Sequence, residues 1–263
     1  MANFDLADRV AIVTGGAQGF GKAIAVGLAH QGANVVVAAR EPEQVTTGRE
    51  RPHASVNPVV DEIKAIGSRA LGITVDVRDQ DQVNSMVAQT MDEFKRIDIL
   101  INVAGGSWGE TFRSGPLLEL EPHDFIECYR LNVLTGLMCS KAVYPIMKGQ
   151  GKGAIVNIAS GAGVNPGVGQ AAYGAAKAGV ISMSKSMAYE WAPEIRVNSI
   201  ALGGIETPHR PMWNETVRAT TTTRSAMGRL GTPDEHAGTV CWLVSDAAGY
   251  MNGATIEADG GRH

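Results

Sequence analysis

The chain has 263 residues, of which 44% are hydrophobic and 19% are charged, and 23 basic against 27 acidic side chains give a formal net charge of −4. This composition is typical of a globular protein with a large core and excludes the disordered, collagen-like and disulfide-rich classes. The mild acidity and the lack of a basic run argue against a nucleic-acid partner, and no apolar run reaches the ~20 residues of a membrane span.

The three cysteines, Cys128, Cys139 and Cys241, lie far apart and follow no metal-ligand spacing. We therefore expect reduced, buried thiols and no metal site. The first residues lack the positive start and apolar core of a signal peptide, which predicts a cytoplasmic protein.

Short β-branched runs alternate with stretches of helical spacing along the chain. The runs predicted as strands, each buried on both faces, are 10–13, 35–37, 71–75, 97–101, 154–158 and 195–200. Between them, for example over 83–94, apolar residues recur at steps of three and four, as on the buried face of a helix. The alternation predicts an α/β fold over residues 1–263: a single-domain, Rossmann-like, doubly wound parallel sheet with helices on both faces.

Two segments depart from this alternation. Residues 41–58 are polar and contain three prolines, which predicts an irregular surface loop. The stretch at about 208–228 follows the last of these strands and is predicted to be a mobile lid over the substrate.

A glycine-rich turn, TGGAQGFG, directly follows the first strand at residues 14–21 and precedes a helix-compatible run. Glycines let the backbone approach a pyrophosphate, whose charge helix N-terminal amides then hold. Any tight turn can use glycine, but the preceding strand and the following helix favour a dinucleotide site.

The second strand ends at Ala39 and Arg40, and Arg40 lies 19 residues beyond Gly21, close to the ~20 expected for the position that reads the ribose. An acidic residue there would accept the 2′-hydroxyl of NAD, whereas a guanidinium suits a 2′-phosphate. A solvated arginine is the alternative, and Gln18 adds no second positive charge. The pattern favours NADP(H) over NAD(H).

Tyr173 and Lys177 are four residues apart and project from one face of a predicted helix. This spacing is common, but Ser160 follows the fifth strand 13 residues earlier, at the carboxyl edge where ligands of such sheets bind. A neighbouring ammonium favours the phenolate and lowers the pKa of a tyrosine from about 10, which makes Tyr173 a usable general acid or base. Ser160 would hydrogen-bond the substrate oxygen.

Taken together in chain order, these motifs resemble those of a classical short-chain dehydrogenase/reductase, and the resemblance covers essentially the whole chain. It rests on the glycine turn from Thr14, Asp76, the segment Asn102 to Gly105, Asn132, Ser160, Tyr173, Lys177, the turn at 205–208 and the closing Asp259-Gly260-Gly261. The chain departs from the usual pattern at Val103, where a second asparagine is common, and at Leu202, where a proline is common.

The resemblance implies a role for each matching residue. Asn132 would hold a water in a proton relay that reaches Lys177, and so joins Ser160, Tyr173 and Lys177 as a catalytic candidate. The candidate cofactor-binding residues are Gly15, Gln18, Gly19, Phe20, Gly21, Arg40, Asp76, Val77, Asn102, Ala104, Gly105, Tyr173, Lys177, Ile205 and Thr207. Among these, Asp76 would contact the adenine, Lys177 the nicotinamide ribose, and Ile205 and Thr207 the nicotinamide amide.

The resemblance implies an oxidoreductase that transfers a hydride between NADP(H) and a ketone or secondary alcohol of a small molecule. The alternatives are an NAD(H)-dependent secondary-alcohol or sugar dehydrogenase, a 3-oxoacyl-carrier reductase, and a catalytically silent module that senses the cofactor. Candidate substrate-pocket residues are Trp108, Gly161, Gln170 and Trp213. The resemblance and the apolar stretches 125–147 and 171–191 also predict a homotetramer.

Overall fold

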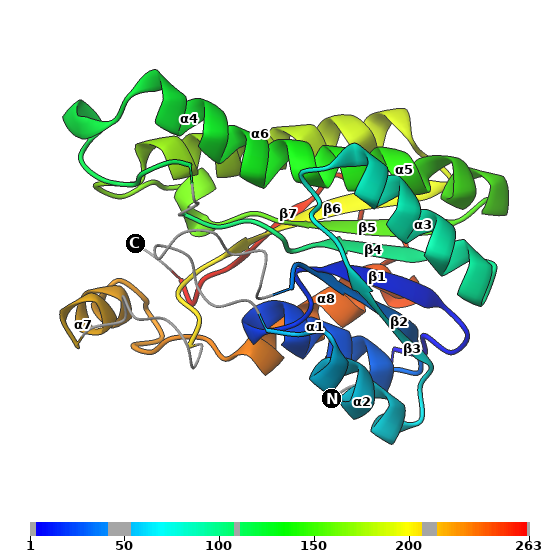
Figure 1. Cartoon of the computed structure of the whole chain (residues 1–263). Coiled ribbons are helices and arrows are strands. Elements are labelled where there is room, and N and C mark those ends of the chain that lie inside the picture. The colour runs from blue at the N-terminus through cyan, green and yellow to red at the C-terminus, as the bar shows by residue number, and fades with distance from the viewer. Residues whose placement is uncertain (1–3, 42–53, 108–110, 207–214, 262–263) are drawn as a thin grey trace.

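A computed structural model of the chain describes residues 4–41, 54–107, 111–206 and 215–261 (Figure 1). One parallel sheet of seven strands, in the order β3-β2-β1-β4-β5-β6-β7, forms its centre. The strands are β1 (Val10–Thr14), β2 (Asn34–Ala39), β3 (Ala70–Thr74), β4 (Ile99–Asn102), β5 (Gly153–Ile158), β6 (Ile195–Leu202) and β7 (Thr255–Ala258). The predicted doubly wound α/β fold is confirmed.

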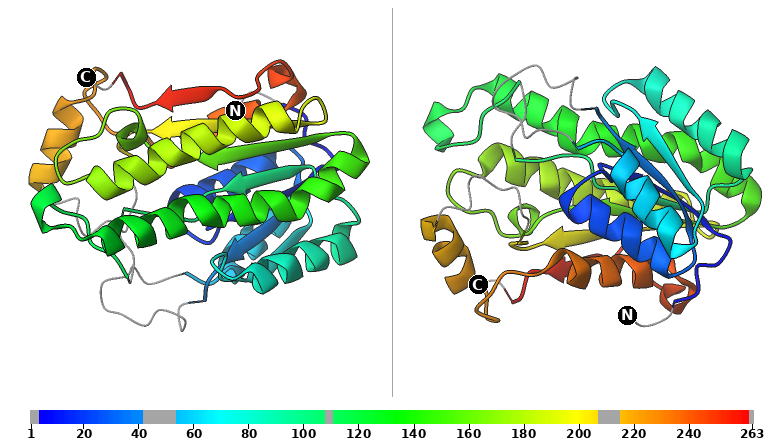
Figure 2. Two further views of the ribbon diagram at one scale, coloured as in Figure 1. Left: turned by 90° about the horizontal axis from the view of Figure 1, so that it is seen from above. Right: turned by 60° about the horizontal axis from the view of Figure 1, so that its bottom comes forward.

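Helices cover both faces of the sheet (Figures 1 and 2). One face carries α1 (Gly19–His30), α2 (Asn57–Ile66) and α8 (Pro233–Val244). The other carries α3 (Gln80–Phe94), α4 (Pro122–Tyr129), α5 (Thr135–Gln150) and α6 (Ala171–Glu190), while α7 (Glu215–Thr223) stands apart at one end of the sheet. Short helical turns lie at η2 (Leu117–Glu119), η4 (Gly161–Gly163) and η5 (Asp246–Ala248), and the π-helix η3 (Arg130–Leu134) joins α4 to α5. Among the described residues, none of these helices is long and apolar enough to cross a membrane.

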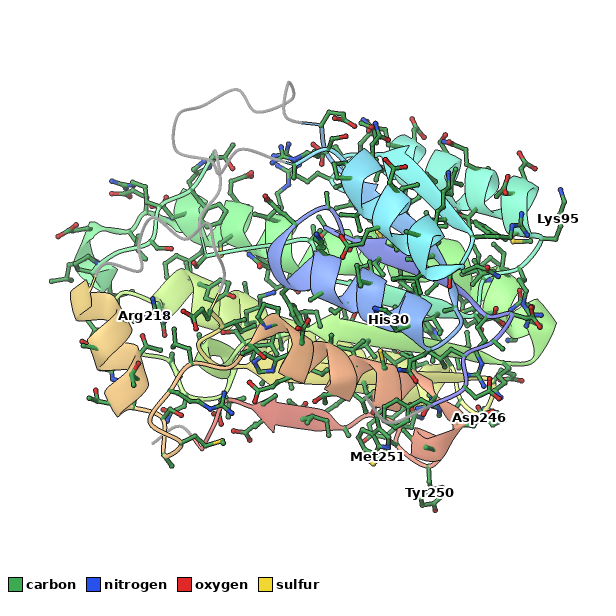
Figure 3. The ribbon with its side chains drawn as sticks, turned by 90° about the horizontal axis from the view of Figure 1, so that it is seen from below. His30, Lys95, Arg218, Asp246, Tyr250 and Met251 are labelled. Carbon is green, nitrogen blue, oxygen red and sulfur yellow. The ribbon has the colours of Figure 1, made fainter. Side chains whose placement is uncertain are left out.

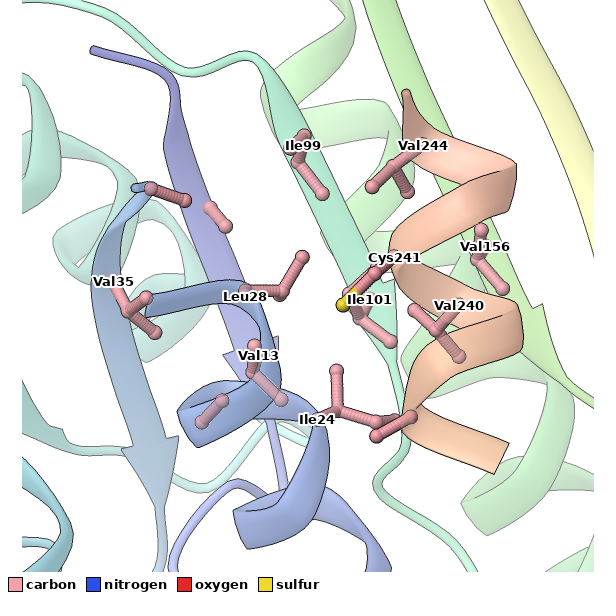
Figure 4. Close-up of a cluster of buried hydrophobic side chains, with 14 of the residues drawn as sticks. Val13, Ile24, Leu28, Val35, Ile99, Ile101, Val156, Val240, Cys241 and Val244 are labelled. Carbon is pink, nitrogen blue, oxygen red and sulfur yellow. The ribbon is translucent and has the colours of Figure 1, made fainter. Parts of the chain in front are cut away.

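The central strands are mostly apolar on both faces because successive side chains enter two different cores. In β1, Ala11 and Val13 pack toward α1 and α8, whereas Val10 and Ile12 pack toward α3 and α5. Figure 4 shows the first core, in which Leu28 of α1 and Cys241 of α8 meet strand residues such as Val13. The three cysteines are free and buried, as expected.

The two edge strands differ from the prediction. Only Ile73 is buried in β3, because this strand has a neighbour on one side alone, so its expected burial on both faces is wrong. The strand at the other edge, β7, was not predicted, because none of its four residues is buried, Glu257 is exposed, and the segment lacks the long apolar run of the inner strands.

The predicted loop over 41–58 is too long at its end. Asn57 and Pro58 already belong to α2, where Pro58 occupies the first turn, a position at which the missing amide hydrogen of proline is harmless. Residues 42–53 lie outside the described part of the chain. Of the predicted lid, 208–214 are likewise not described, and α7 forms much of the remainder.

The strand register brings distant segments to a common edge. Thr14 pairs with Ala38 of β2 and with Asn102 of β4, which pairs in turn with Asn157 of β5. The loops that follow these strands therefore meet at the carboxyl edge of the sheet. Figure 3 shows the two ends of the molecule: Arg218 of α7 lies at one end, and Lys95 and Asp246 lie at the opposite end.

Candidate active site

The glycine turn after β1 is held in a conformation that side chains would prevent. Gly15 has a φ of 67° and Gly19 a φ of 53°, in the left-handed region that favours glycine. A Cβ on Gly21 would lie 2.1 Å from the carbonyl oxygen of Gly15, so the start of α1 packs directly on the turn. The loop is therefore as compact as a backbone cradle for a phosphate requires.

The N-terminus of α1 also fits an anion. Its N-cap residue Gln18 makes no capping hydrogen bond, and its first turn contains no acidic residue. By contrast, Asp79 caps α3 by accepting from the amides of Asp81 and Gln82 at 2.9 and 3.2 Å. The N-cap side chain thus does not occupy the amides at the start of α1, and the helix dipole there favours a negative ligand such as a pyrophosphate.

Thr14 ties this turn to the loop after β4. Its hydroxyl donates to the carbonyl oxygen of Ile101 at 3.3 Å and accepts from the amides of Val103 and Ala104 at 3.1 and 3.3 Å. A Cβ on Gly15 would lie 3.2 Å from the nitrogen of Ala104. The two loops that are predicted to line the cofactor therefore touch each other.

Lys177 lies at the centre of the candidate catalytic group. Its side chain projects from α6, is only 4% exposed, and donates from Nζ to the carbonyl oxygen of Ile158 at 2.7 Å. The same Nζ lies 5.8 Å from the centre of the half-buried Tyr173 ring, as the spacing of the two residues predicts. Burial lowers the pKa of the Lys177 ammonium to about 8, although the nearby Cys128 sulfur opposes this shift.

Ser160 is brought to this pair by close packing of η4 on α6. A Cβ on Gly163 would lie 2.6 Å from the carbonyl carbon of Lys177, and a Cβ on Gly174 would lie 2.8 Å from the oxygen of Ala162. Ser160 stands two residues beyond β5, and its Oγ accepts from the amide of Ala162 at 3.2 Å. Small residues on both sides of the contact therefore hold the serine at the lysine end of α6.

Asn132 lies in the π-helix, and its side chain is hydrogen-bonded to backbone atoms of Gly106 and Cys128. Nδ2 donates to the carbonyl oxygens of Gly106 and Cys128 at 2.9 and 3.0 Å, while Oδ1 accepts from the amide of Gly106 at 3.0 Å. A Cβ on Gly105 would lie 2.7 Å from this Oδ1 and 3.6 Å from Nζ of Lys177. The side chain thus fastens the loop after β4 beside the lysine.

Asn102 faces away from the sheet edge into a buried polar network. Its Nδ2 donates to Ser140 Oγ at 3.0 Å and to Asn157 Oδ1 at 2.8 Å, and Asn157 Nδ2 donates to Ser184 Oγ at 2.9 Å. Its Oδ1 is buried and has no hydrogen-bond partner among the described residues. The network joins β4 and β5 to α5 and α6 beneath the site.

At the adenosine end of the predicted cofactor site, Arg40 and Asp76 follow β2 and β3. Arg40 Nη1 lies 3.9 Å from Asp76 Oδ2, and Arg78 Nη2 lies 2.5 Å from the same oxygen. Burial raises the pKa of Asp76, but the hydrogen bonds from Arg78 outweigh it and hold that pKa below its ordinary value. Val77, next in the chain, is buried.

At the nicotinamide end, Ile205 is buried and forms a β-bridge with Gly231. In the predicted substrate pocket, Gly161 is buried and Gln170 accepts a hydrogen bond from the amide of Gly167 at 2.9 Å. Trp108, Thr207 and Trp213 lie outside the described residues.

Sequence reasoning missed three residues of this site. The carbonyl of Ile158 could not be recognised, because a backbone acceptor has no sequence signal. Arg78 follows Asp76 and Val77 in the sequence, which shows a positive charge at this position but does not show that the arginine pairs with Asp76. His236, at the start of α8, is 7% exposed with Nε2 unpartnered among the described residues, and its ring meets Phe20 of the glycine turn edge-on at 6.0 Å.

Known proteins resemble this chain along nearly its whole length. A family model described as enoyl-(acyl carrier protein) reductase matches residues 15–263. A (2S)-[(R)-hydroxy(phenyl)methyl]succinyl-CoA dehydrogenase subunit, BbsD, from Thauera aromatica is 38% identical over 97% of this chain and 96% of its own length. A 3-oxoacyl-[acyl-carrier-protein] reductase from Synechocystis sp. is 37% identical over 97% of both chains.

Among solved structures, a 7α-hydroxysteroid dehydrogenase in complex with NADH and 7-oxo glycochenodeoxycholic acid superposes with a TM-score of 0.85 at 29% identity. The match covers 99% of this chain and 96% of that one. The glycine turn, the order of the strands and these relatives all indicate the same family. The chain belongs to the classical short-chain dehydrogenase/reductase family, whose members are NAD(P)(H)-dependent oxidoreductases of alcohol and ketone groups.

Proposed function

We propose that the protein transfers a hydride between NADP(H) and a ketone or secondary alcohol of a small molecule, with Tyr173 as the general acid or base. The observation that carries this proposal is the buried Lys177 ammonium, 5.8 Å from the Tyr173 ring at the carboxyl edge of the sheet. The bound nicotinamide supplies or accepts the hydride, and the polypeptide moves the proton.

Each residue of the group has a distinct task. The Tyr173 hydroxyl gives a proton to the carbonyl oxygen in reduction and takes it back in oxidation. Lys177 stabilises the phenolate that remains, because a positive charge in a poorly solvated site favours an adjacent negative one. Ser160 Oγ donates to the substrate oxygen as negative charge develops there. Asn132 is proposed to hold a water in the proton relay that reaches Lys177.

The choice of NADP(H) rests on Arg40. Its side chain is 13% exposed at the end of β2, where Ala39 and Arg40 supply no acceptor for a ribose 2′-hydroxyl. A charge-assisted contact with a 2′-phosphate is worth roughly 1.5–3 kcal/mol, or about ten- to a hundredfold in affinity. Arg40→Ala is expected to weaken NADPH binding by about this factor and to leave NADH binding nearly unchanged, as measured by titration of cofactor fluorescence. Equal weakening of both would mean that Arg40 does not select between the two cofactors.

For the substrate, the relatives support two classes. BbsD and the hydroxysteroid dehydrogenase are named for ring-bearing substrates, which favours a cyclic or aryl-substituted ketone or alcohol. The similarity to 3-oxoacyl-[acyl-carrier-protein] reductase favours a 3-oxoacyl thioester as the second candidate. A panel of cyclic ketones, secondary alcohols and 3-oxoacyl thioesters, assayed with both cofactors, separates these classes. Turnover of any member excludes a catalytically silent cofactor sensor, and turnover of none supports one.

We also propose a homotetramer. Apolar side chains remain exposed on α4 and α6, where Ile126 is 58%, Tyr129 44% and Tyr189 78% exposed. Helices with such faces can bury them against copies of themselves. Light scattering at micromolar concentration is expected to give four times the chain mass, and a monomeric mass contradicts the proposal.

A further inference from the structure

The helix α7 stands apart from the other helices at the carboxyl edge of the sheet (Figure 1). Of its side chains, the structure describes those of residues 218–223, and none of these is buried. Within the described part of the chain, α7 makes no extensive contact with another helix or strand. Arg218 pairs with Glu206 beyond the end of β6, but both side chains are about half exposed, and an ion pair in that setting contributes little. The position of α7 therefore depends strongly on the segments at its ends.

The segment that leaves α7 is hydrogen-bonded to a pair of glycines near the end of the chain. The amide of Ala226 donates to the carbonyl oxygen of Gly261 at 3.1 Å. The amide of Met227 and the hydroxyl of Ser225 both donate to the carbonyl oxygen of Gly260, each at 3.1 Å. The two glycines follow β7 after a single residue, and β7 pairs with β6 in the sheet. The C-terminal end of α7 is therefore attached to the edge strand of the sheet.

The contact at Gly260 leaves no room for a side chain. The φ of Gly260 is 72°, in the left-handed region, and a Cβ on this residue would lie 2.4 Å from Ser225 Oγ. A Cβ on Gly261 would lie 3.1 Å from the Cβ of Ala226. Glycine at both positions thus lets the backbone approach residues 225–227 closely enough for the three hydrogen bonds. A side chain at position 260 would displace the segment that ends α7.

We propose that the glycine pair Gly260-Gly261 positions α7 at the entrance of the candidate active site, by fastening the end of this helix to β7. The inference rests on the proposed function and on the predicted role of the stretch at 208–228 as a cover over the substrate. Gly260 and Ser225 are positioning residues, which act through α7 and not on the reacting atoms. The adenosine end of the predicted cofactor site follows β2 and β3, at the side of the sheet opposite β7. Loosening α7 is therefore expected to affect the substrate and not an adenosine ligand.

Hydrogen exchange of the full chain, followed by mass spectrometry, measures how firmly α7 is held. Gly260→Ala is expected to speed exchange over residues 218–227 by about tenfold or more, which corresponds to about 1.4 kcal/mol of local stability. Gly253→Ala is the matched control. Gly253 precedes β7 and has the same φ of 72°, but a Cβ on it would be in ordinary contact with Ala188 at 3.4 Å. The control thus introduces the same backbone strain and should leave exchange of α7 unchanged.

A second substitution tests whether the close contact itself controls the helix. Ser225→Ala removes the hydroxyl that obstructs a side chain at position 260, and leaves the Ser225 Cβ at an ordinary contact distance of 3.6 Å. Added to Gly260→Ala, it is expected to restore most of the protection of residues 218–227. Unchanged exchange in Gly260→Ala, a change no larger than in Gly253→Ala, or no rescue by Ser225→Ala overturns the proposal.

Kinetics with a substrate identified from the panel test the consequence for the reaction. Gly260→Ala is expected to raise the KM of the substrate about three- to tenfold, with the affinity for adenosine 5′-monophosphate within a factor of about two. Faster exchange of α7 with an unchanged KM would mean that the helix does not act on the substrate, and it also overturns the proposal. The proposed function fails separately, if no member of the panel is turned over, and the exchange experiment then still decides whether Gly260 holds α7.

Discussion

The chain contains two Tyr-x-x-x-Lys pairs on neighbouring helices, Tyr144/Lys148 in α5 and Tyr173/Lys177 in α6, and their surroundings differ. Lys148 is exposed and donates to the Tyr144 hydroxyl at 3.0 Å, and this hydrogen bond raises the pKa of the lysine. Lys177 is buried and donates instead to the backbone of β5, and burial lowers its pKa to about 8. The same spacing thus gives a surface contact at one place and a pair with a buried lysine at the other.

The position of each pair along its helix explains the difference. Tyr144 and Lys148 lie in the last turns of α5, toward the amino edge of the sheet, whereas Tyr173 and Lys177 lie in the first turns of α6, at the carboxyl edge. The loops after β1, β4 and β5 converge only at the carboxyl edge. A tyrosine and a lysine become a candidate acid–base pair where other segments desolvate the lysine.

The largest expected effect is a loss of activity on substitution of Tyr173 and not of Tyr144. Tyr173→Phe removes the proton-transfer group and is expected to reduce turnover by about 10²- to 10⁴-fold, with cofactor binding nearly unchanged. Lys177→Ala is expected to impair both turnover and cofactor binding. Tyr144→Phe is the control and should retain activity. Steady-state kinetics together with cofactor titration measure both quantities, and wild-type activity in Tyr173→Phe would show that the assigned acid–base group is wrong.

The second prediction compares the two lysines through the pH dependence of stability. A lysine whose pKa is about 8 in the folded chain and ~10.4 when unfolded binds fewer protons in the folded state between these values, so stability rises with pH across that window. Relative to Lys177→Met, the wild type is expected to gain about 2 kcal/mol of unfolding free energy between pH 7.5 and 9.5.

Urea unfolding at the two pH values measures this gain. Relative to Lys148→Met, the wild type should show no such gain, because the pKa of Lys148 is shifted upward and not downward. Parallel pH profiles of the wild type and Lys177→Met would contradict a desolvated ammonium at this position.

The third prediction concerns the close contact that places Ser160. Gly163→Ala sets a Cβ 2.6 Å from the backbone of Lys177, so η4 must move away from α6. We expect a loss of about 1 kcal/mol or more of stability, together with a lower kcat. Gly149→Ala in α5 is the matched control, because its Cβ would meet no atom within 4 Å, and it should preserve or slightly raise stability. An unchanged kcat in Gly163→Ala would argue against a role for Ser160 in the proposed reaction.

The smallest expected effect concerns His236, a second buried base. Burial lowers its pKa, although Glu235 opposes the shift, so the folded chain favours the neutral ring. The unfolded chain then binds more protons as the pH falls below ~6.5, and stability declines with it. His236→Leu is expected to reduce the drop in urea midpoint between pH 7.5 and 5.5, and an unchanged drop would argue against burial of a neutral imidazole.

Much of the candidate site could be predicted from the sequence because its signals are local. The glycine turn, the position of Arg40 and the order of Ser160, Tyr173 and Lys177 are fixed by short spacings next to recognisable strands and helices. The hydrogen bond from the Asn132 side chain to Gly106, 26 residues away, could not be predicted, and neither could the ion pair of Arg40 with Asp76. Such contacts depend on which loops meet at the sheet edge.

The sequence by itself determined the alternation of strands and helices, the glycine-rich turn after β1 and the candidate acid–base residues, because hydrophobic period and glycine placement act within a few residues of the chain. Tertiary structure decided which of two equivalent Tyr-x-x-x-Lys pairs is buried, and which carboxylate Arg40 and Arg78 share. It also made β3 and β7 the partly exposed edges of the sheet. Burial and charge environment are properties of the assembled loops, and they shift a lysine pKa by amounts that spacing alone cannot set.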